Sequence, residues 1–160
     1  MTGSAAVLSA LVDEYDAKWS ALDFAGLADL WEDTAPEPVY IGDEYATPLI
    51  GADELERHWA RVAGRLKRAS VSSQLRSADV FVDGFARCVV LSRWSFTGRE
   101  SDVEHNGSSW ITWLLVARGD KYRIFHHMES QVYLDEHDDR DRPREAEEAA
   151  KSRSHRPGTA

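Results

Sequence analysis

Apolar side chains in the first 66 residues recur at intervals of three and four, the spacing that places them on one face of a helix. The first such segment starts near Ser4, and a second, shorter one follows Asp23, a residue type that caps helix N-termini. After an extended piece at residues 39–45, a third helix is expected over residues 52–66. The apolar faces of the first and third helices are Val7, Leu8, Leu11, Val12, Tyr15 and Trp19, and Leu55, Trp59, Val62 and Leu66.

From Ser70 onward the period changes to two, the alternation expected of strands. Four segments rich in β-branched and aromatic residues are predicted to be strands, at residues 71–82, 86–97, 109–117 and 122–133. Their links contain Gly and Asp, so consecutive strands should pair antiparallel. Three helices followed by a curved antiparallel sheet predict an α+β domain whose helices cover one face of the sheet.

The last predicted hairpin has a two-residue turn at Gly119-Asp120, and this turn fixes the register of its strands. Counting back from the turn pairs Trp113 with His126 and places Met128 on the same, otherwise apolar face. That face should be the concave one under the helices. His126 would then lie in an apolar chamber, where burial keeps an imidazole neutral near pH 7.

Composition divides the chain near residue 134. All of the Trp, Tyr and Phe residues lie between Tyr15 and Tyr133, whereas residues 135–160 contain no Val, Ile, Leu, Met or aromatic side chain. Such a segment cannot bury enough apolar surface to offset its ordering entropy. We therefore expect one folded domain over residues 1–134 and a charged, disordered tail over residues 135–160.

Charge and cysteine content exclude several classes of protein. The formal net charge is −9 and no basic stripe occurs, which argues against a nucleic-acid partner. Cys88 is the only cysteine, so neither an intramolecular disulfide nor a cysteine zinc site can form. Residues 1–19 match neither a signal peptide nor a membrane span. A cytoplasmic protein that does not bind membranes is expected.

Several short motifs occur in a distinctive order: Leu30-Trp31-Glu32-Asp33, then Val39-Tyr40-Ile41-Gly42, then Gly51 before the third helix, and a closing strand over residues 122–130. In this order residues 4–133 resemble the SnoaL-like branch of the nuclear-transport-factor-2-like superfamily. The resemblance implies a cone-shaped α+β barrel that encloses a pocket, commonly as a dimer through the outer face of the sheet. Members include ketosteroid isomerases, polyketide cyclases, dehydratases, lyases and non-catalytic binders, so the fold alone does not choose a function.

The chain also departs from that branch in its last strand. Members often carry two histidines two residues apart there, and in the predicted register the corresponding positions are His126 and Met128. The aspartates that act as bases in the isomerases and cyclases have no clear match, and no such role is transferred.

The candidate catalytic residues are therefore those near the expected pocket whose side chains can transfer a proton or donate a hydrogen bond. His126 could act as a base or proton shuttle, or could be a core histidine satisfied by a carbonyl or a tyrosine hydroxyl. Tyr40 or Tyr45 could hold a substrate oxygen or stabilise an oxyanion, although core packing with the hydroxyl at the surface is the more expected role of both. His58, on the third helix, could face the pocket but is expected at its rim.

Aromatic side chains suggest the kind of ligand. The predicted lining residues are Trp19, Trp59, Trp94, Phe96, Trp113 and Met128, and they favour a small, planar, hydrophobic molecule. No helical His-x-x-x-His pair, phosphate loop, dinucleotide fingerprint or nucleophile elbow occurs, so neither a metal nor a cofactor is expected.

Two functions remain open from the sequence. The first is a cofactor-independent acid–base enzyme, an isomerase, cyclase, dehydratase or lyase, acting on an aromatic or polycyclic substrate. The second is a non-catalytic module that binds a small molecule or dimerises. A homodimer is expected in either case, because Trp110, Leu114 and Phe125 lie among polar residues on the outer face of the sheet.

Overall fold

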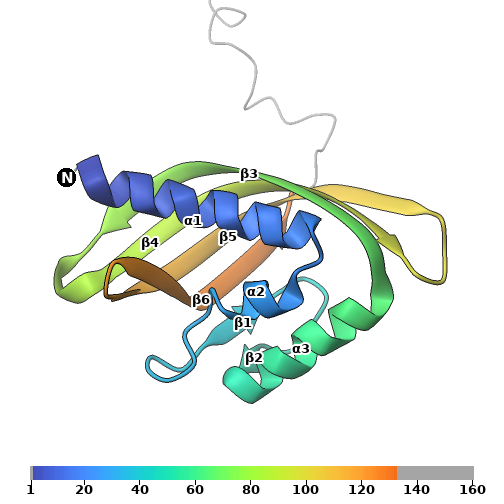
Figure 1. Cartoon of the computed structure of the whole chain (residues 1–160), viewed down its shortest axis with the longest axis horizontal. Helices are drawn as coiled ribbons and strands as arrows, with labels where there is room; N and C mark the ends of the chain where they lie inside the picture. Colours follow the sequence, from blue (N-terminus) through green and yellow to red (C-terminus); the bar gives the residue numbers. More distant parts are fainter. Residues whose placement is uncertain (1, 133–160) are drawn as a thin grey trace, which may run out of the picture.

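The computed structural model describes residues 2–132, and the tail expected at 135–160 lies outside the described residues. Helices precede most of the strands, as predicted (Figure 1). The elements are α1 (Thr2–Ser20), α2 (Phe24–Ala28), β1 (Val39–Ile41), β2 (Leu49–Ile50), α3 (Ala52–Arg65), β3 (Leu66–Val80), a 3₁₀ turn (Val82–Gly84), β4 (Phe85–Gly98), β5 (Glu104–Arg118) and β6 (Lys121–Gln131).

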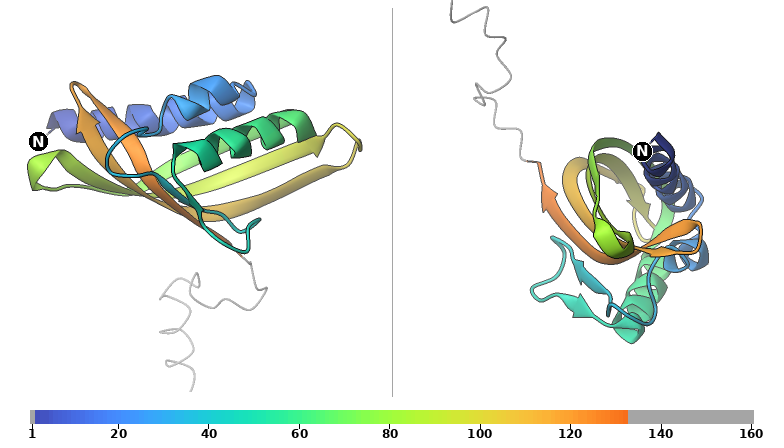
Figure 2. Two further views of the ribbon diagram at one scale, coloured as in Figure 1. Left: turned by 90° about the horizontal axis from the view of Figure 1, so that it is seen from below. Right: turned by 90° about the vertical axis from the view of Figure 1, so that its left-hand side faces the viewer.

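The six strands form one strongly curved sheet in the order β2-β1-β6-β5-β4-β3. Strands β3 to β6 make the predicted antiparallel meander, and the α+β class is confirmed. Strand β1 adds to the other side of β6 in parallel orientation. The sheet stays open, and its concave side is covered by the helices (Figure 2).

The core lies between α1 and the concave face of the sheet. The helical spacing predicted for α1 buries Leu8, Leu11, Val12 and Tyr15. They pack against alternate residues of the strands, which include Val90, Ile111, Trp113, Leu115 and Ile124. Burying each aliphatic side chain contributes about 1.5–3 kcal/mol, so this layer holds α1 over the sheet.

Polar contacts fix the ends of the helices. Asp23 caps α2, as predicted, by accepting a hydrogen bond from the Gly26 amide at 2.9 Å. The Asp16 carboxylate on α1 accepts hydrogen bonds from the amide and the hydroxyl of Ser73 on β3, at 2.5 and 2.6 Å. These contacts set the position of α1 along the sheet, and with it the wall of the cavity described below.

The register of the β5–β6 hairpin agrees with the prediction near the turn and differs beyond it. Leu115 pairs with Ile124 as expected, but Leu114 then pairs with His126. Phe125 is therefore the extra residue of a β-bulge. Side chains alternate between the two faces of a strand, so one inserted residue exchanges the faces of every residue that follows.

The bulge overturns part of the predicted site. His127, rather than His126, pairs with Trp113 and lies on the concave face, where it is buried. Glu129 follows it onto the same face. His126 and Met128 face the convex side, and the prediction that they point inward is wrong.

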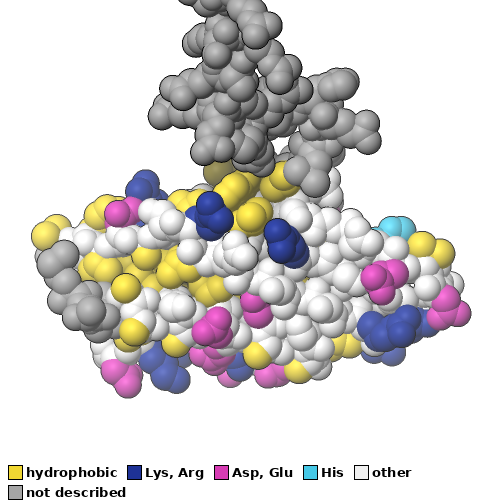
Figure 3. All heavy atoms as spheres, turned by 90° about the horizontal axis from the view of Figure 1, so that it is seen from above, with side chains coloured by type: hydrophobic (Ala, Val, Ile, Leu, Met, Phe, Trp, Pro, Cys, Tyr) yellow, Lys and Arg dark blue, Asp and Glu magenta, His cyan; other side chains and the backbone are white. Residues whose placement is uncertain are grey.

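The outer surface carries several exposed hydrophobic side chains. Figure 3 shows hydrophobic atoms gathered at the end of the molecule where β3 turns into β4. Exposed hydrophobic residues at this end are Val80, Phe81, Val82 and Phe85. Among residues 2–132, no helix has the length and apolar character needed to cross a membrane.

Candidate active site

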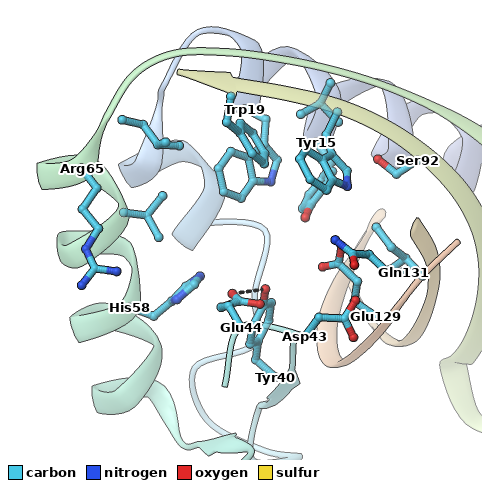
Figure 4. Close-up of a pocket in the computed structure, with 16 residues that line it drawn as sticks. Tyr15, Trp19, Tyr40, Asp43, Glu44, His58, Arg65, Ser92, Glu129 and Gln131 are labelled. Atoms are coloured by element: carbon cyan, nitrogen blue, oxygen red, sulfur yellow. Dashed lines mark hydrogen bonds between the residues drawn. The ribbon is translucent and has the colours of Figure 1, made fainter. Parts of the chain in front are cut away.

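A cavity of about 460 Å³ opens between α1, α3 and the concave face of the sheet. Figure 4 shows side chains from all three sides pointing into it. Its lining is Tyr15, Trp19, Tyr40, Asp43, Glu44, His58, Val62, Arg65, Leu66, Val71, Ser92, Trp94, Phe96, Ile111, Glu129 and Gln131. A cavity of this size holds a small organic molecule.

Three of the aromatic residues chosen from the sequence lie on the cavity wall. They are Trp19, Trp94 and Phe96. Trp94 and Phe96 stack with ring centroids 5.2 Å apart, and the indole of Trp94 donates a hydrogen bond to the Ser109 hydroxyl at 3.1 Å. The Trp94 ring lies over Gly107 of β5, and the bond to Ser109 fixes the orientation in which it lines the cavity.

The other three chosen residues do not line the cavity in the described part of the chain. Trp59 and Trp113 are buried in the core behind its wall, and Met128 is 46% exposed on the convex face. His126 is half-buried on the same convex face. Burial and the neighbouring His127 lower the pKa of His126.

A hydrogen bond from the core fixes the tautomer of the His127 ring. The indole Nε1 of Trp113 donates a hydrogen bond to His127 Nδ1 at 2.9 Å. An indole N–H can only donate, so Nδ1 must be unprotonated and the neutral ring carries its hydrogen on Nε2. This Nε2 lies 3.5 Å from Glu129 Oε2. His127 therefore presents an N–H to the Glu129 carboxylate.

Glu129 brings a carboxylate to the cavity wall. Its side chain is 20% exposed. Burial raises the pKa of the Glu129 carboxyl, but hydrogen bonds from His127 and Ser109 outweigh burial and bring that pKa below its ordinary value. Glu129 is thus ionised at neutral pH, although it lies in a largely apolar chamber.

His58 is far more buried than the rim position expected from the sequence. It is 2% exposed and lines the cavity. Arg61 donates a hydrogen bond to the Tyr45 hydroxyl, which lies 2.8 Å from His58 Nδ1. Arg61 leaves the hydroxyl hydrogen of Tyr45 free, and we assign that hydrogen to the bond with His58 Nδ1.

His58 is therefore a neutral imidazole whose Nε2 carries the ring hydrogen. Burial first, then the charges of Arg61 and His127, lower the pKa of His58 to about 4. With Nδ1 accepting, the ring hydrogen is on Nε2. That atom is buried and has no hydrogen-bond partner within residues 2–132. Tyr45, a candidate catalytic residue from the sequence, instead lies behind His58 and orients it.

Tyr40 lies between the two buried imidazoles. Because β1 runs beside β6, Tyr40 pairs with His127, and its ring is 4.7 Å from His127 and 4.8 Å from His58. Its hydroxyl donates to Glu44 Oε1 at 2.8 Å. Burial and the nearby carboxylates Glu44 and Glu129 raise the pKa of Tyr40 well above its ordinary value. Tyr40 therefore stays protonated.

The SnoaL-like domain family matches residues 8–134, which is most of the chain. The chain belongs to the SnoaL-like family. No curated protein matches it in sequence.

Solved structures share the fold of this SnoaL-like protein at low sequence identity. A ketosteroid isomerase-like protein from Erwinia carotovora atroseptica has a TM-score of 0.69 and 15% identity, over 80% of this chain and 95% of that one. A candidate scytalone dehydratase from Novosphingobium aromaticivorans has a TM-score of 0.72 and 8% identity, over 81% and 85%. A type 2 hexachlorocyclohexane dehydrochlorinase has a TM-score of 0.67 and 10% identity, over 81% and 86%.

The sequence of this SnoaL-like protein did not identify His127 and Glu129, the two neighbouring polar residues of β6 that face the concave side. Strict alternation from the turn placed both outside, and nothing in the local sequence marks the bulge at Phe125. The family's two-residue spacing in the last strand offered one signal, because His127 and Glu129 have that spacing and both face inward. Within the described residues, no group of three or more His, Cys, Asp and Glu side chains could hold a metal ion.

Proposed function

We propose that this protein is an acid–base enzyme in which the Glu129 carboxylate removes a proton from a carbon atom of a small hydrophobic substrate. The observation that carries the proposal is the presence, on one cavity, of an ionised, largely buried carboxylate and an imidazole N–H that has no hydrogen-bond partner among residues 2–132. In Figure 4, Glu129 enters from β6 and His58 from α3, on opposite sides of the cavity. With this separation, the base can reach a C–H bond next to a carbonyl group while the donor reaches the carbonyl oxygen.

Glu129 takes the proton from the carbon next to the carbonyl, and the C–H electron pair moves to make an enolate. The charge on the enolate oxygen is stabilised by the N–H of His58, which is neutral and so loses no proton of its own. Where a C=C bond is conjugated with the enolate, return of the proton to the far end of that conjugated system completes an isomerisation. Where the β-carbon carries a leaving group, its departure with the bonding electron pair forms a C=C bond and completes an elimination. Both outcomes need only the side chains named.

The side chains that contact Glu129 and His58 from outside the cavity support these roles. His127 is fixed by Trp113, and its Nε2 faces Glu129 Oε2 at 3.5 Å, so the imidazole supports the carboxylate from one side. The Tyr45–Arg61 pair fixes His58 in the same manner. Fixed groups lose little entropy when the substrate reacts, which is a main source of rate enhancement.

The structural neighbours are consistent with this chemistry. Their names include a ketosteroid isomerase-like protein, a candidate dehydratase and a dehydrochlorinase. A base that removes a proton from carbon serves isomerisation and elimination alike, so the proposal does not select between them.

The proposal can be tested without the natural substrate. The probe is 2-tetralone, a planar ketone with acidic C–H bonds, and proton NMR in D₂O measures exchange of those hydrogens for deuterium. We expect the protein to catalyse exchange, and Glu129→Gln to slow the catalysed rate by about 10²- to 10⁴-fold. Glu104→Gln, an exposed acid on β5, is the matched control and should leave the rate unchanged.

Two results would overturn the proposal. One is an exchange rate in the wild type no higher than in Glu129→Gln. The other is an equal loss in Glu104→Gln, which would trace the effect to overall charge. Either would leave the cavity as a binding site without this chemistry, the second function that the sequence allowed.

A further inference from the structure

The polar groups of the cavity are divided between two walls. On α3, the Nε2–H of His58 and the guanidinium of Arg65 can only donate hydrogen bonds. On the other wall are three carboxylates: Asp43 and Glu44 after β1, and Glu129 on β6. Figure 4 shows the carboxylates across the cavity from Arg65.

The carboxylates after β1 have no cationic partner in the described part of the chain. No Lys or Arg of residues 2–132 forms a salt bridge with Asp43 or Glu44. Glu44 Oε1 accepts a hydrogen bond from Tyr40, which leaves its second oxygen free. Both side chains are exposed, so they give the cavity a negative potential that attracts cations from solution.

A second observation shows that the cavity is built to hold a ligand. His58 is 2% exposed, and its Nε2–H has no partner in the described chain although it lines the cavity. A buried donor without a partner costs about 1–3 kcal/mol, and a ligand oxygen placed opposite it would remove that cost. A ligand complementary to the cavity therefore carries a hydrogen-bond acceptor on the side of α3 and a positive group on the side of the carboxylates.

The aromatic wall agrees with a positive ligand. Trp19 packs against Phe96 with ring centroids 5.4 Å apart, and Phe96 stacks on Trp94. Aromatic faces attract cations, and they attract them more strongly when water is excluded. Rings and carboxylates on one cavity are the combination that recognises organic amines.

We propose that the ligand of this cavity carries a protonated amine, bound by Asp43 and Glu44, and an oxygen acceptor that faces His58, joined by a planar apolar body. The inference rests on the proposed function in taking this cavity as the substrate site, and it narrows the substrate class. Binding of the amine by Asp43 and Glu44 leaves the Glu129 carboxylate for proton transfer.

The test compares two ligands of the same shape and different charge. Naphthalen-2-ylmethanamine is protonated at pH 7, and naphthalen-2-ylmethanol is its neutral counterpart. Titration calorimetry on the full chain should give a Kd for the amine at least about tenfold below that of the alcohol, with the difference shrinking as NaCl is raised. Equal affinities, or no binding of either compound, would overturn the proposal.

Paired variants locate the effect. Asp43→Asn with Glu44→Gln should raise the Kd of the amine to near that of the alcohol and leave the Kd of the alcohol unchanged. Asp33→Asn with Glu56→Gln makes the same change in net charge at exposed positions outside the cavity, and should keep the preference for the amine. A preference that survives the first pair, or is lost equally in the second, would refute the assignment.

The experiments distinguish failure of the amine-binding proposal from failure of the proton-transfer proposal. If the amine is not preferred while 2-tetralone exchange still depends on Glu129, the substrate class is wrong and the chemistry stands. If the amine is preferred but exchange is insensitive to Glu129→Gln, the cavity binds amines without the proposed proton transfer.

Discussion

Burial of His58 should make the stability of this protein fall as the pH is lowered from about 6.5 to about 4. The pKa of His58 is lowered from 6.5 to about 4, by burial first and then by Arg61 and His127. In the unfolded chain the imidazole has its ordinary pKa. Below pH 6.5 the unfolded state therefore takes up a proton that the folded state refuses, and the free energy of unfolding decreases until the pH reaches the folded pKa.

The size of the effect follows from the shift. Each unit of pKa difference corresponds to about 1.4 kcal/mol, so His58 alone should remove about 3 kcal/mol across the whole window. At about pH 4.5, where most proteins of this size can still be studied, about 2 kcal/mol of this loss should be visible. Above pH 6.5 the side chain should contribute no pH dependence.

Urea unfolding followed by tryptophan fluorescence measures this loss in the wild type and in His58→Gln, which cannot titrate. Other groups, such as Asp16 and Glu32, titrate in both proteins, so they cancel when the two curves are subtracted. The difference in free energy of unfolding between the two proteins should change by about 2 kcal/mol from pH 7 to about pH 4.5. His105→Gln, an exposed histidine on β5, should follow the wild type. Parallel curves for the wild type and His58→Gln would refute the buried, neutral state assigned to His58.

Three further predictions concern catalysis, the core and assembly. The pKa of Glu129 lies below its ordinary value, and His58 stays neutral down to about pH 4. The rate of 2-tetralone exchange should therefore be constant from pH 8 to pH 5 and fall only at lower pH. A fall centred near pH 6.5 would indicate a histidine base. Trp113→Phe removes the donor to His127 Nδ1 and should lower the free energy of unfolding by about 2 kcal/mol or more, with the ¹⁵N resonances of His127 losing the pattern of a single Nε2–H form. A stable variant with unchanged resonances would contradict that role. Trp110 and Met128 are 42% and 46% exposed on the convex face, so we expect a dimer through this face. The variant Trp110→Glu should weaken that dimer. Light scattering that gives 18.0 kDa for the wild type at micromolar concentration would exclude the dimer.

The order and type of most elements could be predicted because they depend on local pattern. A three- and four-residue spacing buries one side of α1 and α3, and a two-residue spacing turns the less exposed side chains of β3, β4 and β5 to one face of the sheet. The turn at Gly119 was predicted from residue type, and Gly119 has the positive φ of 63° that such a turn requires. The strand ends were placed less well: β3 begins at Leu66, directly after α3, and β5 begins at Glu104, within the expected link. Polar residues there are held by pairing with the neighbouring strand, which leaves no apolar pattern to read.

The cavity residues show the limit of that reasoning. Trp19, Trp94 and Phe96 could be chosen because large aromatic side chains on the inner face of an element must fill or line its interior. His58 could be named as a candidate, but its burial could not, because it depends on Tyr40 and Tyr45, which pack over the ring from a different segment.

The sequence by itself determined the helices, the long strands and the side of each that is apolar, since those properties arise from neighbouring residues. Only the tertiary structure decided which polar groups meet. The bulge at Phe125 turns His127 and Glu129 inward, and the parallel pairing of β1 with β6 brings Tyr40 against His127. Both depend on contacts between segments far apart in the chain, where the energy of packing the whole sheet outweighs the alternation of a single strand.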